Sequence, residues 1–101
     1  METPFTSTRV PNGVGLFVFG SYSRSVAVRD LDVLAVYDPD IIAHDTIYEV
    51  LRPVLSALGD AASVPVDLTV LTQREERDLR FVITESARPI AEFPELLLAL
   101  H

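Results

Sequence analysis

The chain contains no cysteine and no lysine among its 101 residues. Without cysteine, it cannot form disulfides or zinc–thiolate sites, and it cannot use a thiol as a nucleophile. Without lysine, it has no Schiff-base residue and no phosphate-binding lysine of the P-loop kind. Histidine occurs only at His44 and His101, which disfavours a histidine-rich metal site. Carboxylates and hydroxyls therefore remain as the main candidates for catalysis.

Basic charge is also scarce, because eight arginines stand against 15 acidic residues and give a net charge of -7. An acidic surface repels phosphate backbones, so we expect no direct binding of nucleic acid. No apolar run approaches the roughly 18–20 residues of a membrane-spanning helix, and the first residues lack the features of an export signal. The sequence thus predicts no membrane partner and a cytoplasmic location, where nucleotides and Mg²⁺ are available.

The length and the 49% hydrophobic content predict one small domain over residues 1–101. Residues 1–14 are rich in Thr, Pro and Gly and are expected to form an irregular lead-in. Hydrophobic patterning predicts an α+β domain, with a small mixed sheet of three to four strands and helices packed on it. The expected strands cover 15–19, 30–37, 64–71 and a short edge segment within 87–93, and the expected helices cover 38–59, 72–86 and 94–101.

The long helix is predicted from its first residues and its apolar spacing. Asp38 can cap a helix and Pro39 suits the first helical position. Apolar residues then recur at spacings of three and four as far as Gly59, and they place His44 on the apolar face as a packing residue. Pro53 is expected to kink this helix or split it in two.

Three aspartates are the candidates for a metal site. Asp30 and Asp32 stand two residues apart on a predicted strand, so their Cβ atoms share one face at a separation of about 6–7 Å. Asp67 is the one acid in the apolar segment 64–71, where an unpaired carboxylate is costly to bury. Because Mg²⁺ prefers oxygen ligands, we expect these three side chains to form one cluster that holds Mg²⁺.

A Gly20-Ser21 turn follows the first strand directly. Glycine lets a phosphate approach the backbone, and the serine hydroxyl can donate a hydrogen bond to it. Arg24 could neutralise phosphate charge. A turn of this kind beside a carboxylate-bound Mg²⁺ has the features that a nucleoside triphosphate requires.

An Asp-x-Asp pair alone is a weak signal, and the chain holds a second one at Asp38 and Asp40 that we interpret as helix capping. The first pair gains specificity from its context of an apolar strand, a Gly-Ser turn and a later acid. This context resembles the DNA polymerase β-like nucleotidyltransferase superfamily, and most closely its minimal members, the MNT antitoxins of HEPN–MNT pairs. The residues that match the family pattern are Gly20, Ser21, Arg24, Asp30, Asp32 and Asp67.

The resemblance implies a function for each matching residue. Asp30, Asp32 and Asp67 would be catalytic and would bind two Mg²⁺ ions. Gly20, Ser21 and Arg24 would bind the nucleotide, with ATP as the substrate. The implied reaction transfers AMP to a hydroxyl of a partner protein, a HEPN-type toxin, and would make this chain the antitoxin of the pair.

Two alternatives stay open. The turn departs from the family pattern at Tyr22 and Ser25, and only eight residues separate Ser21 from Asp30, which favours a catalytically weak antitoxin that acts by binding only. The other alternative is a small-molecule (antibiotic) nucleotidyltransferase, although such enzymes are much longer. The apolar segment 93–100 is expected either to pack within the domain or to contact a partner.

Overall fold

A computed structural model describes residues 9–24 and 28–100 of the chain. It contains a four-stranded mixed sheet, and the predicted α+β class is confirmed. The strands are β1 (Val14–Phe19), β2 (Leu31–Tyr37), β3 (Val66–Thr72) and β4 (Arg88–Pro89). The helices are α1 (Gly20–Ser23), α2 (Ile47–Ala62), α3 (Gln73–Leu79), α4 (Phe81–Thr84), the 3-10 helix η1 (Ile90–Glu92) and α5 (Pro94–Leu98).

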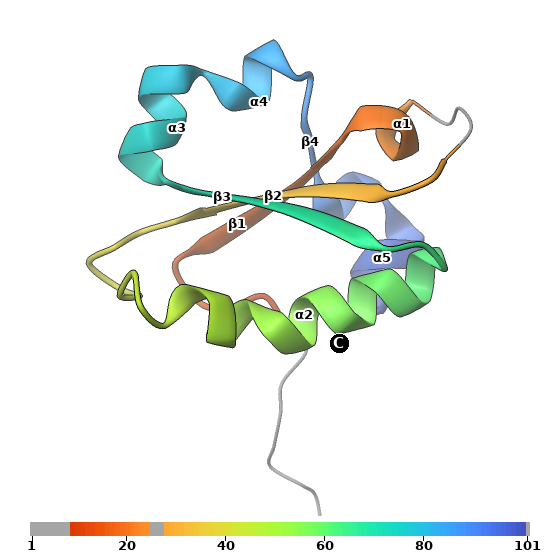
Figure 1. The fold of residues 1–101 in the computed structure, drawn as a ribbon, viewed down its shortest axis with the longest axis horizontal. Coiled ribbons are helices and arrows are strands. Elements are labelled where there is room, and N and C mark those ends of the chain that lie inside the picture. Colours follow the sequence, from red (N-terminus) through yellow and green to blue (C-terminus); the bar gives the residue numbers. More distant parts are fainter. Residues whose placement is uncertain (1–8, 25–27, 101) are drawn as a thin grey trace, which may run out of the picture.

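The sheet has the strand order β3-β2-β1-β4. β1 pairs antiparallel with β2 and β4, whereas β2 and β3 are parallel and are joined by the crossover helix α2. Figure 1 shows α2 and α5 on one face of the sheet and α1, α3 and α4 on the other. Within the described ranges, no helix has both the length and the apolar character needed to cross a bilayer.

The main core lies between the sheet and α2. Alternate residues of β2 face this helix and are buried, and they lie on the side opposite Asp32, the separation of faces that the alternation along residues 30–37 predicts. The other face of β2 carries Asp32, so the alternation places this carboxylate on the side of α1, α3 and α4. The side chains that fill the centre of the core are Val18, Leu31, Val33, Leu51, Val54 and Leu58.

The predicted start of the long helix is wrong. The Asp38 side chain accepts a hydrogen bond from the backbone N–H of Asp40 at 2.9 Å. This is the bond that a helix N-cap residue makes, but only the one turn after it forms, closed by the Ile42 N–H that donates to the Asp38 carbonyl at 3.0 Å, and residues 38–46 are turns rather than a continuous helix. His44 therefore lies in these turns rather than on a helix, and its Nδ1 is hydrogen-bonded to the hydroxyl of the buried Tyr37. The helix α2 begins only at Ile47.

The predicted end of this helix is also wrong, and of the kink or split predicted at Pro53 the split does not occur. α2 continues past Gly59 to Ala62, because Gly59 packs closely against Val66 of β3 instead of ending the helix. Ser63 ends it in the left-handed conformation. Pro53 lies inside α2 without splitting it.

The segment after β3 is partly as predicted. β3 begins two residues later than expected and ends at Thr72, which forms the capping box that the sequence Thr72-Gln73-Arg74-Glu75 predicts. Its hydroxyl accepts from the Glu75 N–H at 3.1 Å, and its own N–H donates to Glu75 Oε1 at 2.8 Å. The single helix expected over 72–86 is wrong, because Arg80 adopts a left-handed conformation with φ 53° and separates α3 from α4.

Removing the capping hydroxyl with Thr72→Ala is expected to lower the free energy of unfolding by about 1 kcal/mol, the usual value of an N-cap. Thr72→Ser is the matched control, because it keeps the hydroxyl and is expected to retain most of the stability. Urea unfolding of the three proteins measures the effect. An equal loss in both variants would show that Thr72 acts by packing rather than by capping.

The end of the chain follows the prediction of a short edge strand and a final short helix, which the structure shows as β4 and α5. Leu96 and Leu100 are buried in the main core, whereas Leu97 and Leu98 are exposed. The segment 93–100 therefore packs within the domain on one side and offers two leucines to solvent on the other. His101, residues 1–8 of the predicted lead-in and residues 25–27 lie outside the described residues.

Candidate active site at the β2–β3 edge of the sheet

The first residues of β2 and β3 bring two of the predicted acids together. Asp32 and Asp67 are register partners in the parallel pair, and register partners in a sheet project from the same face. Asp30 stands just before β2 and is exposed, as is Asp67, whereas Asp32 is partly buried. The expected placement of Asp67 on the face of Asp32 is therefore what the structure shows.

Gly20 forms the wall against which the Asp32 carboxylate packs. Asp32 is also in register with Phe19, the last residue of β1, so its side chain lies beside the turn that follows. A Cβ atom on Gly20 would lie 3.1 Å from the Asp32 Cγ and closer still to its Oδ2. Gly20 has φ +73°, a left-handed conformation that side chains rarely adopt. Both the space and the backbone conformation therefore require glycine here.

Burial and neighbouring charge both affect the titration of Asp32. Burial raises the pKa of the Asp32 carboxyl above its ordinary value of 3.8, and the charges of Asp67 and Asp30 raise it further. Both neighbouring acids thus raise the pKa of the Asp32 carboxyl. An excess of negative charge of this kind favours a bound cation.

The raised pKa gives a stability prediction with a defined sign. Since folding raises the pKa of Asp32, the native state binds this proton more tightly than the unfolded state does, and ionisation destabilises the fold as pH rises above 3.8. Asp32→Asn is therefore expected to be more stable than the wild type at neutral pH. Thermal unfolding of both proteins across this range measures the difference. An advantage that persisted unchanged below pH 3.8 would contradict the electrostatic cause.

A hollow of about 360 Å³ opens beside Gly20 on the side of α4. Its lining includes two guanidinium groups, those of Arg24 and Arg88, together with several hydroxyls. Two cations against the one carboxylate of Glu85, with hydroxyl donors around a glycine, suit an anion such as a phosphate. The residues that line the hollow are Gly20, Ser23, Arg24, Thr84, Glu85, Ser86 and Arg88.

Arg88 is held in place by three contacts. Its Nη1 donates to the Ser23 carbonyl at 3.2 Å, and its Nε donates to Glu92 Oε1 at 2.7 Å. The guanidinium lies over the Phe93 ring, 4.9 Å from the centroid. No local sequence pattern points to Arg88, because only the pairing of β4 with β1 brings it beside the Gly20 turn.

The helix α1 is fixed from its other side by Tyr22. The Tyr22 hydroxyl donates to Glu95 Oε2 at 2.6 Å, and its ring lies 5.8 Å from that of Phe93. Burial raises the pKa of Tyr22 to about 12, and the Glu95 hydrogen bond and charge add to the effect. Tyr22, which departs from the family pattern, thus connects α1 to α5. Ser21 lies in the same helical turn, where its carbonyl accepts from the Arg24 N–H at 3.1 Å.

Asp30, Asp32 and Asp67 are the residues that could hold Mg²⁺. Within residues 9–24 and 28–100, no three His, Cys, Asp or Glu side chains lie close enough to form a metal site as they stand. Asp30 and Asp67 are nevertheless exposed, and both raise the pKa of Asp32. Their side chains can therefore turn toward a cation at low cost. The donor set, all carboxylate oxygens, is the kind that Mg²⁺ prefers.

The chain was also compared with known proteins. No protein-family model, no curated protein and no solved structure matches it. The chemistry proposed for this site therefore depends on its geometry and on the sequence pattern at Gly20-Ser21 and Asp30-x-Asp32.

Proposed function

We propose that this chain is a minimal nucleotidyltransferase that binds ATP with Mg²⁺ between Asp30, Asp32 and Asp67 on one side and the Gly20-Ser21 turn on the other. The observation that carries the proposal is the contact of Asp32 with Gly20. Because of this contact, Asp32, which would bind the metal, adjoins the turn that would hold the phosphates. The hollow with Arg24 and Arg88 adjoins the same turn.

Each group has a defined task in this proposal. Asp30, Asp32 and Asp67 would hold two Mg²⁺ ions, which neutralise charge on the triphosphate and on the leaving pyrophosphate. Gly20, Ser21 and Arg24 would bind the phosphates, with Arg88 as an additional cation.

The reaction is a displacement at the α-phosphorus. Asp67 would accept the proton of an acceptor hydroxyl, whose oxygen then bonds to the α-phosphorus. The bond from that phosphorus to the bridging oxygen breaks, and pyrophosphate leaves. The products are an AMP ester of the acceptor and pyrophosphate.

We further propose that the acceptor is a hydroxyl of a partner protein, a HEPN-type toxin, with this chain as the antitoxin. The net charge of -7 supports a basic protein acceptor over a nucleic acid. A small-molecule acceptor, as in antibiotic nucleotidyltransferases, is the alternative.

A second candidate function is binding of the partner without transfer. It is favoured by the absence of a preformed three-acid metal group within the described ranges. Binding alone would require the partner surface but not the metal.

The test is to incubate the chain with the product of a neighbouring reading frame, labelled ATP and Mg²⁺, and to follow label and mass on the partner. Transfer predicts a mass increase of one AMP on the partner with the wild type and none with Asp32→Asn. Asp40→Asn is the matched control, because it makes the same change in the exposed turns 38–46. A stable complex without added mass would support binding only, and the absence of both complex and label would contradict both candidates.

A further inference from the structure

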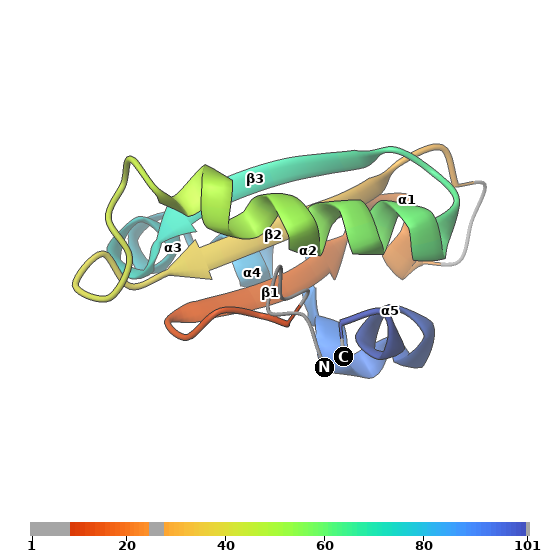
Figure 2. The ribbon, with the colours of Figure 1, turned by 90° about the horizontal axis from the view of Figure 1, so that it is seen from below.

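The two edges of the sheet differ in how they are protected. β4, at one edge, has only two residues, and one of them is Pro89. β3, at the other edge, has seven residues, no proline and Asp67 as its one charged residue. Short length, proline and charge are the usual devices that prevent strands from pairing between molecules. Figure 2 shows β3 along the outer side of the sheet above α2, and of those devices this edge carries only the single charge of Asp67.

The hydrogen-bond pattern identifies which backbone groups of β3 point outward. The Leu31 N–H donates to the Pro65 carbonyl at 2.8 Å, and Leu31 is in register with Val66. In a parallel pair, this hydrogen bond means that the backbone N–H and carbonyl groups of residues 65, 67, 69 and 71 point toward β2. The N–H and carbonyl groups of Val66, Leu68 and Val70 therefore point away from the sheet. The side chains of the same three residues pack against the core as partly buried groups.

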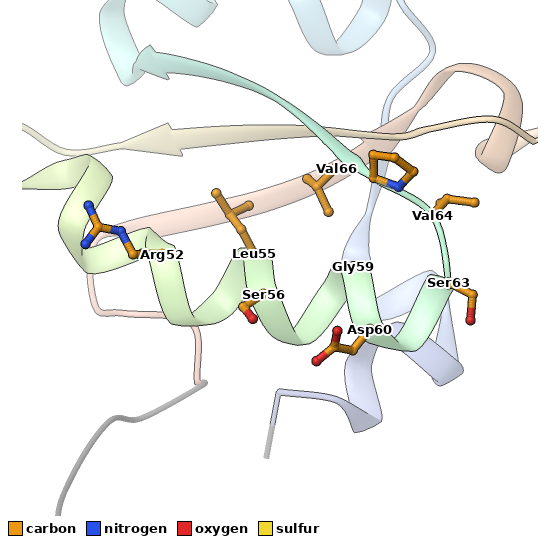
Figure 3. Close-up of a pocket in the computed structure, with 9 residues that line it drawn as sticks. Arg52, Leu55, Ser56, Gly59, Asp60, Ser63, Val64 and Val66 are labelled. Atoms are coloured by element: carbon orange, nitrogen blue, oxygen red, sulfur yellow. The ribbon is translucent and has the colours of Figure 1, made fainter.

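A groove of about 610 Å³ runs between this edge and α2 (Figure 3). Its walls include the apolar Leu55, Val64 and Val66. Its rim carries charges of opposite sign on one helix, with Arg52 toward one end and Asp60 toward the other (Figure 3). Both charged side chains are exposed, and no ion pair between them is part of the structure described.

We propose that the β3 edge and this groove bind a second copy of the chain, through antiparallel β3–β3 pairing about a twofold axis at Leu68. Leu68 would pair with its own copy, and Val66 with Val70 of the other. The outward groups of these three residues would then form six backbone hydrogen bonds. Their side chains would form a continuous apolar row on the α2 side of the joined sheet.

The charges of the groove fit the same axis. A twofold axis pairs Arg52 of each copy with Asp60 of the other when it passes at the level of Ser56, midway between them. Gly59 lies against Val66, because a Cβ atom placed on Gly59 would be 3.4 Å from Val66 Cγ2. Ser56 lies three residues back along α2, about 4.5 Å, which corresponds to one or two residues forward along β3. The charge pairing and the strand pairing therefore place the axis at Leu68 within about 2 Å.

The proposal does not depend on the enzymatic function, because Val66, Leu68 and Val70 lie on the sheet face opposite Asp67. It does predict an effect on that acid, since the two Asp67 side chains would lie diagonally, about 7–8 Å apart. Asp67→Asn is accordingly expected to dimerise more tightly than the wild type.

Sedimentation equilibrium over about 1–300 µM protein tests the dimer directly. The average mass is expected to rise from 11.2 kDa toward twice that value. Arg52→Asp and Asp60→Arg, each alone, are expected to raise the dissociation constant about tenfold, and the double variant is expected to restore it. Arg74→Asp and Asp78→Arg make the same charge changes on the exposed surface of α3 and are expected to have no effect.

Amide hydrogen exchange identifies the interface by residue. Exchange at Val66, Leu68 and Val70 is expected to slow as protein concentration rises, whereas Asp67 and Thr69 are already bonded to β2 and should change little. A monomer at all concentrations would overturn the proposal. A dimer without slowed exchange at these three amides, or one insensitive to both charge reversals, would overturn it equally.

Discussion

Asp32→Asn is expected to weaken Mg²⁺-dependent binding of ATP by about a hundredfold or more, because under the proposed function it removes a direct metal ligand. The substitution keeps the shape of the side chain and its fit against Gly20 while it removes the charge on which Asp30 and Asp67 act. Nucleotidyl transfer is expected to fall by about a thousandfold or more, since the metal stabilises the charge of the transferring group. Calorimetric titration of ATP with and without Mg²⁺ measures the binding effect.

The same variant separates function from folding, because Asn at this position is expected to stabilise the fold at neutral pH. Loss of binding in a more stable protein cannot be attributed to unfolding. Asp40→Asn is the control for the loss of one negative charge and is expected to bind as the wild type does. Equal binding by the wild type and Asp32→Asn would remove Asp32 from the metal site.

Gly20→Ala is expected to lower the free energy of unfolding by about 2 kcal/mol or more and to remove ATP binding. Alanine at φ +73° adopts a left-handed conformation at a cost of about 1–2 kcal/mol. Its Cβ would also collide with the Asp32 carboxylate and would displace it from the site. Urea unfolding and ATP titration of the same protein give the two effects.

A double-mutant cycle with Asp32→Ala separates the two causes. In the Asp32→Ala background the collision is absent, so Gly20→Ala is expected to lower the free energy of unfolding only by the cost of the left-handed backbone conformation. Gly15→Ala is a matched control, because a Cβ there would meet only Phe17 at 3.5 Å. Additive effects of Gly20→Ala and Asp32→Ala on stability would show that the two residues do not interact.

The strands and their faces were predictable from the sequence because alternation fixes which residues are buried. The pattern of β2 placed Leu31 and Val33 in the core and Asp32 on the other face, and the structure agrees. The capping box at Thr72 was equally local, since it depends on residues three positions apart. The start of α2 was not predictable in this way, because Asp38 makes the cap-type bond to the Asp40 N–H but the chain turns again before the helix begins at Ile47.

The candidate site was predictable only in part. Asp67 could be paired with Asp32 because a parallel crossover aligns the starts of two strands at one end of the sheet. The contact between Asp32 and Gly20 depends on the register of β1 with β2, which spacing along the chain does not give. Arg88 could not be predicted as a site residue, since it lies beside the Gly20 turn only because β4, the last strand in the chain, pairs with β1.

The central claim is that Asp30, Asp32 and Asp67 hold a divalent cation beside Gly20. The most direct measurement titrates Mn²⁺, as a paramagnetic substitute for Mg²⁺, into the isotope-labelled chain in the presence of a non-hydrolysable ATP analogue. The amide signals of Gly20, Asp32 and Asp67 are expected to broaden first, and Asp32→Asn is expected to abolish this broadening. Broadening that begins at the acids of α3, or that is unchanged in Asp32→Asn, would contradict the account.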